Sequence, residues 1–133
     1  MGLDSPRTIV IVGAGHLGQA LADARNFNSG PFRVAALFDT DGRKIGSRTR
    51  TGVPIRSLAD LPGAALEAKV EIGVVAVPAE FALASANLLV SGGVRALLNF
   101  AAATVGPFPG VPVKNVDMTL FLENLSFQLR GRP

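Results

Sequence analysis

Residues 9 to 23, IVIVGAGHLGQALAD, combine the signals that decide the fold of this chain. Four β-branched residues predict a strand, and the segment that ends in QALAD predicts a helix. Between them stand Gly13, Gly15 and Gly18. Glycine is required where a chain turns with positive φ or where another group comes close to its backbone, and a strand-to-helix loop that holds a phosphate needs both. The spacing alone also fits a plain tight turn, so the surrounding sequence has to decide.

The rest of the chain alternates strand-like and helix-like segments. Strands are expected at 8–12, 32–39, 52–55, 70–77, 94–100 and 111–116, and helices at 16–26, 58–68, 79–91 and 118–129. Strands that are apolar on both faces and separated by helices are typical of a parallel sheet covered on both sides. We therefore predict an α/β fold with a doubly wound, mostly parallel sheet of the Rossmann type. Residues 1–116 would form this domain, and 117–133 a C-terminal helix.

Composition limits the class of protein. The chain has 133 residues, which suits one domain, and it contains no cysteine, so disulfides and cysteine-based catalytic or metal sites are excluded. The longest nearly apolar run, residues 72–79, is far shorter than the ~20 residues of a membrane span, and the N-terminus has no signal-peptide core. We expect a soluble, cytoplasmic protein with no metal site and no membrane contact.

Asp39 strengthens the interpretation of the glycines as a nucleotide loop. It ends the second predicted strand, 24 residues after Gly15, close to where an acidic group binds a ribose in dinucleotide-binding folds. In that setting Gly13 makes the turn, Gly15 admits the pyrophosphate and Gly18 lets helix and strand pack. The alternative is a structural glycine turn with an aspartate that merely ends a strand. The loop residues expected to contact the cofactor are Gly13, Ala14, Gly15, His16, Leu17 and Gly18.

The residues around Asp39 bear on which cofactor is bound. A carboxylate accepts hydrogen bonds from ribose hydroxyls and repels a 2′-phosphate, which favours NAD over NADP. A short basic stretch follows at 42–50, and its Arg43 and Lys44 are the residues that could instead accommodate a phosphate. The alternative for this stretch is a solvated loop. Lys44 is included in the predicted site, whereas Asp41 is expected to be a turn residue.

The remaining candidates lie at other strand ends. His16, the single histidine, is expected to be a neighbour of the pyrophosphate, and no acid–base pair is visible, so we predict a protein that is not an enzyme. Ligands of such sheets bind outside the carboxyl ends of the strands. The nicotinamide side should therefore be lined by Val77, Pro78, Asn99 and Phe100, although packing at the strand ends is the alternative for each.

Taken together, these segments resemble the cofactor-binding domain of the Rex family of redox-sensing transcriptional repressors. The resemblance covers nearly the whole chain, in the segments VIVGAGHLGQALA, VAALFDTDGRKIG, LADLP, IGVVAVPAE, GVRALLNFAA and VKNVDMTLFLENLSF. It implies reversible binding of NADH or NAD⁺ without turnover, by homodimers in which the C-terminal helix of one subunit reaches the other. In such proteins the reduced cofactor releases the dimer from operator DNA.

The sequence departs from the family pattern at three places. Family members carry an N-terminal winged-helix domain, whereas seven residues precede the first predicted strand here, so no operator binding is expected from this chain itself. Ala24 stands where the family often has a tyrosine, and Met118 where it commonly has a phenylalanine. The last two changes bear on the redox-dependent switch rather than on cofactor binding.

The helix expected at 118–129 gives separate support for a homodimer. Asp117 can cap its N-terminus. One apolar stripe consists of Met118, Phe121, Leu122, Leu125 and Leu129, and Leu120 and Phe127 lie off it. A helix that is apolar on two sides needs two partners, and a second subunit would supply one, with Asp117 and Met118 close to its cofactor cleft. The alternative is that the helix docks only on its own domain.

Two other functions remain open at this stage. One is the nucleotide-binding fragment of an NAD(P)-dependent dehydrogenase or reductase, which a paired histidine and carboxylate would favour. The other is a CoA-binding domain of the succinyl-CoA-synthetase type, which shares the fold. CoA carries a 3′-phosphate beside the ribose, and Asp39 disfavours it.

Overall fold

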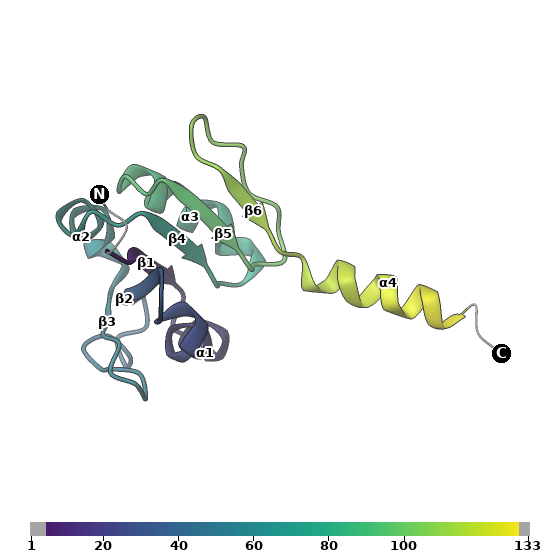
Figure 1. The fold of residues 1–133 in the computed structure, drawn as a ribbon, viewed down its shortest axis with the longest axis horizontal. Helices are drawn as coiled ribbons and strands as arrows, with labels where there is room; N and C mark the ends of the chain where they lie inside the picture. Colours follow the sequence, from purple (N-terminus) through teal and green to yellow (C-terminus); the bar gives the residue numbers. More distant parts are fainter. Residues whose placement is uncertain (1–4, 131–133) are drawn as a thin grey trace.

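A six-stranded sheet runs through the body of the protein (Figure 1), whose computed structural model describes residues 5–130. Its order is β3-β2-β1-β4-β5-β6, and every neighbouring pair is parallel. The strands are β1 Arg7–Val12, β2 Phe32–Asp39, β3 Ile55–Ser57, β4 Ile72–Val75, β5 Ala96–Asn99 and β6 Val113–Asn115. The predicted α/β class with a parallel sheet is confirmed, and the strand of the glycine motif, β1, lies in the middle.

Helices cover the two faces of the sheet. They are α1 His16–Asp23, α2 Leu61–Ala68, α3 Ala82–Ser91 and α4 Met118–Arg130, with short 3₁₀ turns η2 Arg25–Phe27, η3 Leu58–Asp60 and η4 Ala79–Phe81. Alternate residues of β1 face opposite sides, as the two-residue period of a strand requires. Ile9 and Ile11 pack with Ala22 of α1, whereas Val10 and Val12 pack in the core formed with α2 and α3.

Several predicted elements are shorter in the structure. The helix expected at 16–26 ends at Asp23, because Ala24 takes an extended conformation with φ −69° and ψ 130° before η2 begins. The helices expected at 58–68 and 79–91 each begin with a 3₁₀ turn, η3 and η4, before the α-helix starts. The strand expected at 52–55 begins only at Ile55, directly after Pro54, which has no N–H to give to a ladder.

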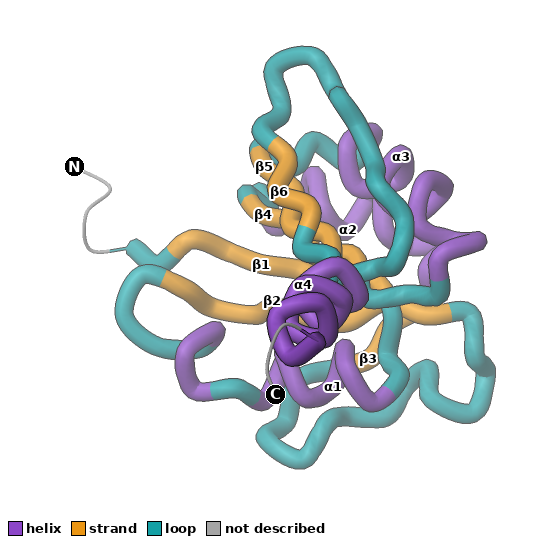
Figure 2. The backbone as a smooth tube through the Cα atoms, turned by 90° about the vertical axis from the view of Figure 1, so that its right-hand side faces the viewer, coloured by secondary structure: helices purple, strands orange, loops and turns teal. Residues whose placement is uncertain are grey.

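The helix α4 leaves the body at the β6 edge of the sheet and extends away from it (Figures 1 and 2). Asp117 Oδ1 accepts a hydrogen bond from Leu120 N at 3.1 Å, so the predicted cap is present. No residue of α4 is buried, which differs from the alternative of docking on its own domain. Over residues 5–130, no helix is long and apolar enough to cross a membrane.

One half of the sheet also lacks a helix on the α1 side. The helix α1 contacts β1 and β2, and an apolar groove of about 460 Å³ lies over β4 and β5 on the same face. The apolar residues that line this groove, here called the sheet groove, are Ile9, Phe27, Phe32, Ile72, Val74, Ala96, Leu97 and Leu98. Asn26 is the one polar residue among the described residues in its lining.

Candidate functional site

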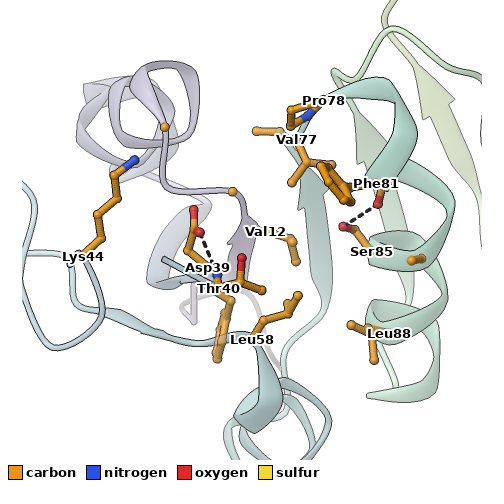
Figure 3. Close-up of a pocket in the computed structure, with 15 residues that line it drawn as sticks. Val12, Asp39, Thr40, Lys44, Leu58, Val77, Pro78, Phe81, Ser85 and Leu88 are labelled. Carbon is orange, nitrogen blue, oxygen red and sulfur yellow. Dashed lines mark hydrogen bonds between the residues drawn. The ribbon is translucent and has the colours of Figure 1, made fainter. Parts of the chain in front are cut away.

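A cavity of about 340 Å³ opens where β1, β2 and β4 end (Figure 3). Carboxyl ends of parallel strands are where ligands bind in open α/β sheets. The glycine loop and the end of β2 line it on one side, and η4 with α3 on the other. Its lining residues are Val12, Gly13, Gly15, Phe38, Asp39, Thr40, Lys44, Leu58, Ala76, Val77, Pro78, Phe81, Ala84, Ser85 and Leu88.

The three glycines of the motif have different reasons to be glycine. At Gly13, φ is +110° and a Cβ would lie 2.2 Å from the carbonyl oxygen of Ala76. At Gly18, a Cβ would lie 1.7 Å from the carbonyl oxygen of Gly13. At Gly15, a Cβ would meet nothing within 4 Å, and φ is −76°. The packing of the protein therefore explains Gly13 and Gly18, whereas Gly15 faces open space in the cavity lining.

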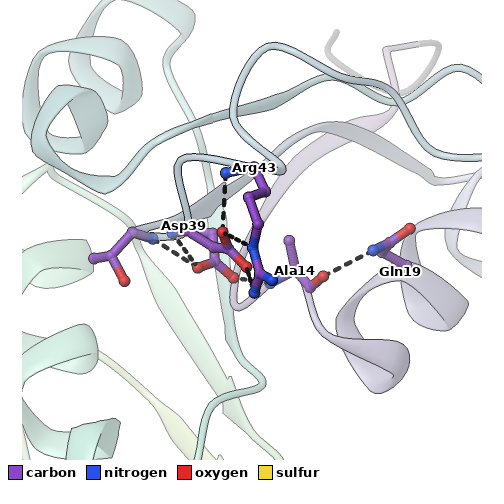
Figure 4. Close-up of polar contacts among 6 residues, drawn as sticks. Ala14, Gln19, Asp39 and Arg43 are labelled. Carbon is purple, nitrogen blue, oxygen red and sulfur yellow. Dashed lines mark hydrogen bonds and ion pairs between the residues drawn. The ribbon is translucent and has the colours of Figure 1, made fainter.

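The N-terminus of α1 begins at the cavity. Gly15 is its N-cap, no side chain caps it, and no acidic residue lies in its first turn. The N–H groups of a first helical turn have no partner inside the helix, and together with the helix dipole they attract an anion. His16 and Leu17 are exposed at this end. The loop is held from inside by Gln19 Nε2, which donates to the Ala14 carbonyl oxygen at 2.8 Å (Figure 4).

Asp39 is fixed by backbone donors (Figure 4). Its Oδ2 accepts from Ala14 N at 2.7 Å, and its Oδ1 accepts from Thr40 N at 2.7 Å and Asp41 N at 2.9 Å. A carboxylate has about four acceptor positions, so roughly one remains, on Oδ2. We predicted from the sequence that Asp39 could receive both hydroxyls of a ribose. The geometry leaves room for one such bond, and the bond to Ala14 joins Asp39 to the glycine loop.

Lys44 is the residue of the basic stretch that lines the cavity. The Arg43 side chain instead bonds Asp41, from Nε to Oδ1 and from Nη2 to Oδ2, both at 3.2 Å. The hydrogen bonds from Arg43 hold the pKa of Asp41 below its ordinary value. Asp41 also accepts from Arg43 N at 2.9 Å, which confirms its role in the turn. Arg48 donates to the Gly52 carbonyl oxygen, away from the cavity.

The wall opposite Asp39 is apolar and comes from η4 and α3. Phe81, Ala84, Ser85 and Leu88 follow the spacing of one helical face, and Leu58 closes the cavity from the other side (Figure 3). The Ser85 hydroxyl donates to the Phe81 carbonyl oxygen at 2.8 Å, so this donor is already used. The wall is suited to a flat apolar ring. These residues and Thr40 are not among the site residues predicted from the sequence, although the 81, 84, 85, 88 spacing after Pro78 indicates such a face.

The structure brings only part of the predicted site together. Gly13, Gly15, Asp39, Lys44, Val77 and Pro78 line the cavity; Ala14, His16, Leu17 and Gly18 belong to the same loop without lining it. The other four lie elsewhere. Asn99 is completely buried, Phe100 packs in the core on the α1 side, Asp117 caps α4, and Met118 is 60% exposed.

Chemistry at the cavity is limited by its titratable groups. Among the described residues that line it, Asp39 and Lys44 are the ones with charged side chains. The carboxylate of Asp39 is engaged with three backbone N–H groups, which suits an acceptor better than a proton-transfer base. Within residues 5–130, no three histidine, aspartate or glutamate side chains gather as metal ligands.

Comparison with known proteins identifies a family and individual proteins to which this chain is similar. Residues 4–103 match the CoA binding domain family. The redox-sensing transcriptional repressor Rex of Desulforamulus reducens is 40% identical over 129 residues, which cover 97% of this chain and 61% of that protein. This chain thus spans about three fifths of the length of such curated relatives.

Solved structures agree with these relatives. The structure of RSP with β-NAD⁺ and operator DNA has a TM-score of 0.90 at 29% identity and covers 98% of this chain and 59% of that one. The structure of RSP with β-NADH has a TM-score of 0.86 at 29% identity, with 98% and 63% covered. RSP is described as a Rex-family repressor.

Proposed function

The chain belongs to the CoA binding domain family, in the form found in Rex repressors, and from this premise we propose that it binds NAD⁺ and NADH reversibly and without turnover. The observation that carries the proposal is Gly15. It lines the cavity at the start of α1, and nothing in the protein requires glycine there. Close approach of a ligand to the backbone would explain why this residue is a glycine.

Each part of the cavity suits one part of the dinucleotide. The pyrophosphate would lie against Gly15 and the uncapped N-terminus of α1, where N–H groups and the helix dipole offset its charge. Asp39 Oδ2 would accept one adenine ribose hydroxyl. The adenine ring would lie against Phe81 and Leu88. The bound cofactor would supply the nicotinamide whose redox state is sensed, and this chain's residues only hold it.

Asp39 also favours NAD(H) over NADP(H), because a carboxylate fixed by three backbone donors cannot turn away from a 2′-phosphate. CoA is a second candidate, favoured by the family that residues 4–103 match. Its 3′-phosphate would meet the same carboxylate. Lys44 lies beside Asp39 in the lining and is the residue able to offset such a charge.

Calorimetric titration with NADH, NAD⁺, NADPH and CoA tests the proposal. We expect Gly15→Ala to weaken NADH binding by roughly tenfold or more, about 1.4 kcal/mol. Gly63→Ala is the matched control, since a Cβ at Gly63 also meets nothing within 4 Å but lies in α2, outside the cavity lining. Equal NADH affinity in both variants would remove the glycine loop from the site. CoA binding more tightly than NADH would favour the second candidate.

Asp39 gives a second variant for the same site. Asp39→Ala should weaken NADH binding by about 1–3 kcal/mol, because a hydrogen bond to a charged acceptor is lost. Asp39→Asn keeps the shape of the side chain but removes the charge and one of the two acceptor oxygens, so one set of backbone contacts is lost as well. If Asp39→Asn raises NADPH affinity while lowering NADH affinity, the proposed selectivity is supported. An unchanged ratio in that variant contradicts it.

We further propose that the chain acts as a homodimer through α4. Seven large apolar side chains of this helix are exposed by 49% to 73%: Met118, Leu120, Phe121, Leu122, Leu125, Phe127 and Leu129. The sheet groove is a second uncovered apolar surface. Only two residues separate β6 from α4, and α4 points away from the body (Figure 1), which supports a contact with the groove of a second copy rather than with its own. In such a dimer Asp117 and Met118 would lie near the partner's cofactor cavity.

Light scattering at micromolar concentration tests the dimer. Burial of a Leu or Phe side chain is worth roughly 1.5–3 kcal/mol before the cost of association. Leu120→Glu with Phe127→Glu should therefore give monomers with weaker NADH binding. Thr119→Glu with Gln128→Glu adds the same charge at polar positions of the helix and should remain dimeric. The mass of one chain for the unaltered protein with NADH would contradict the proposal.

RSP has been crystallised with operator DNA. We propose that this chain supplies the cofactor-binding and dimerising part of a regulator of that kind. No sequence-specific DNA binding is expected from residues 5–130, whose helices α1, α2 and α3 lie on the sheet and whose α4 is apolar on two sides. A mobility-shift measurement with the chain and an operator fragment checks this expectation.

A further inference from the structure

The connection between β5 and β6 is held by two asparagines at the ends of those strands. Asn99 is the last residue of β5 and Asn115 the last of β6, and the two are register partners in the parallel pair. The intervening loop runs over residues 100–112 and rises from the sheet edge (Figures 1 and 2). This pair of side chains, which we call the asparagine clamp, is separate from the lining of the cofactor cavity.

Asn99 has no exposed surface, and both polar atoms of its side chain have hydrogen-bond partners. Its Nδ2 donates to the Ala103 carbonyl oxygen at 2.7 Å and to Asn115 Oδ1 at 2.9 Å. Its Oδ1 accepts from Ala101 N at 2.9 Å. A buried amide with all these partners is held in one orientation, because any rotation would leave a polar group unpaired.

Asn115 continues the same network toward the surface. Its Oδ1 also accepts from Val105 N at 3.1 Å, and its Nδ2 donates to the Val105 carbonyl oxygen at 3.2 Å. The side-chain amide thus pairs with both the N–H and the C=O of one residue, as a neighbouring strand would. It supplies these bonds even though the residue itself is exposed. The two asparagines together tie the loop to the ends of both strands.

The clamp lies directly before α4. Val116 N donates to the Asn99 carbonyl oxygen at 2.8 Å, which is the last sheet-like bond before the helix begins at Met118. Beyond this point no residue of α4 is buried against the body. Whatever direction the helix takes must therefore be set at residues 115–117. On the other side of Asn99, Phe100 N bonds the Val75 carbonyl oxygen at 2.9 Å, next to the Ala76 wall of the cavity.

We propose that Asn99 and Asn115 are positioning residues that fix the direction in which α4 leaves the sheet. The inference goes beyond cofactor binding and does not depend on it. In a symmetric dimer built through α4, a fixed exit direction decides where on the second copy the helix arrives. The clamp would then determine how two copies are oriented in the dimer. Its contribution to the free energy of unfolding of the body is measured separately.

The direction of α4 can be measured within one chain. Because the protein has no cysteine, Ser91→Cys at the end of α3 and Ser126→Cys on α4 provide two unique attachment points for nitroxide labels. The labelled chain is diluted into an excess of unlabelled chain, so pulsed electron paramagnetic resonance reports only the distance inside one subunit. In this background we expect one narrow distance distribution.

Asn115→Ala should broaden that distribution at least twofold or shift its centre, with little change in circular dichroism. Asn115→Asp keeps the acceptor for Asn99 and Val105 N and should give an intermediate width. Asn87→Ala, at an exposed position of α3, is the matched control and should leave the distribution unchanged. A change at the buried Asn99, such as Asn99→Asp, is expected to impair folding. The variants of the exposed Asn115 test the clamp without that complication.

The outcome that overturns the proposal is a distribution for Asn115→Ala that matches the background while the melting temperature falls. That result would make the clamp a stabiliser of the loop alone. If the unaltered chain did not bind NADH or did not dimerise, the proposed function would be contradicted. The distance measurement would still report whether the clamp fixes the direction of α4. The two ideas therefore fail separately.

Discussion

The body of the protein and α4 use similar apolar side chains in opposite ways. In the body, Ile11, Leu37, Leu61 and Leu89 have no exposed surface. In α4, no residue is buried, and Phe127 is 73% exposed. Soluble monomers rarely expose large contiguous apolar surfaces. The difference teaches that the body, apart from the sheet groove, completes its core within one chain, whereas α4 has the composition of a buried helix and is not buried by that chain.

The largest effect that would test the packing of the body comes from Gly18. Gly18→Ala should destabilise the protein by more than about 4 kcal/mol or prevent folding, because the new Cβ would overlap the carbonyl oxygen of Gly13. Urea unfolding followed by circular dichroism measures the loss. Gly15→Ala in the same loop should change stability by less than about 1 kcal/mol. If both variants lost the same stability, the overlap of a Cβ at Gly18 with the Gly13 carbonyl oxygen would not be the cause, and the prediction would be wrong.

A leucine pair tests the contrast between the regions directly. Leu89→Ala should cost about 2–5 kcal/mol at any protein concentration, since it opens a cavity between α3 and the sheet. In the proposed dimer a second copy buries α4, so Leu125→Ala should be almost neutral in dilute protein and become destabilising as concentration rises. Unfolding curves over a hundredfold range of concentration distinguish them. A concentration-independent loss for Leu125→Ala would place α4 against its own body in solution.

The smallest expected effect lies within the body, at Asp23 on α1. Its carboxylate accepts hydrogen bonds from Thr49 Oγ1 and Thr51 Oγ1 and so attaches the 40–54 loop to the helix. Burial alone would raise the pKa of Asp23, but the hydrogen bonds from Thr49 and Thr51 outweigh it and hold this pKa below its ordinary value of 3.8. Asp23→Asn should cost about 1 kcal/mol at pH 7 after solvent screening.

The sign of the pH dependence follows from the lowered pKa. The stabilisation by Asp23 is complete above pH 3.8 and is lost as the pH falls through the lower pKa of the folded state. The unaltered protein and Asp23→Asn should therefore differ in urea midpoint at pH 7 and converge at the acid end. A difference that persists unchanged to pH 2 would assign the effect to packing rather than to charge.

Periodicity and turn chemistry were sufficient to predict the sheet. The apolar runs predicted β1 and β2 almost to the residue, because most residues of both strands are buried. The ends of helices were harder to predict. Ala24 is a good helix former, and its extended conformation depends on the 3₁₀ turn that follows rather than on its own preference. Local propensity does not contain that information.

The site residues could be predicted where their role follows from the spacing of a local sequence motif. Gly13, Gly15 and Asp39 follow from motif spacing, and the structure brings them to one cavity. Asn99 is predicted as a site residue because it ends a strand at the correct edge, and it does not line the cavity. Its internal partners, Ala103 and Asn115, lie 4 and 16 residues away and only the folded chain reveals them. Polar residues at strand ends are therefore ambiguous until their partners are known.

The position of β1 in the middle of the sheet has a consequence for how the chain acquires its structure during synthesis. β1 pairs with β2, which follows closely, but its other neighbour, β4, begins about 60 residues after β1 ends. A nascent chain must therefore keep one edge of its most apolar strand unpaired until β4 leaves the ribosome, which is a period of exposure to aggregation. The helix α4 emerges only after β4, β5 and β6. In the proposed dimer, each subunit would thus complete its sheet before the helix that recruits another copy has been synthesised.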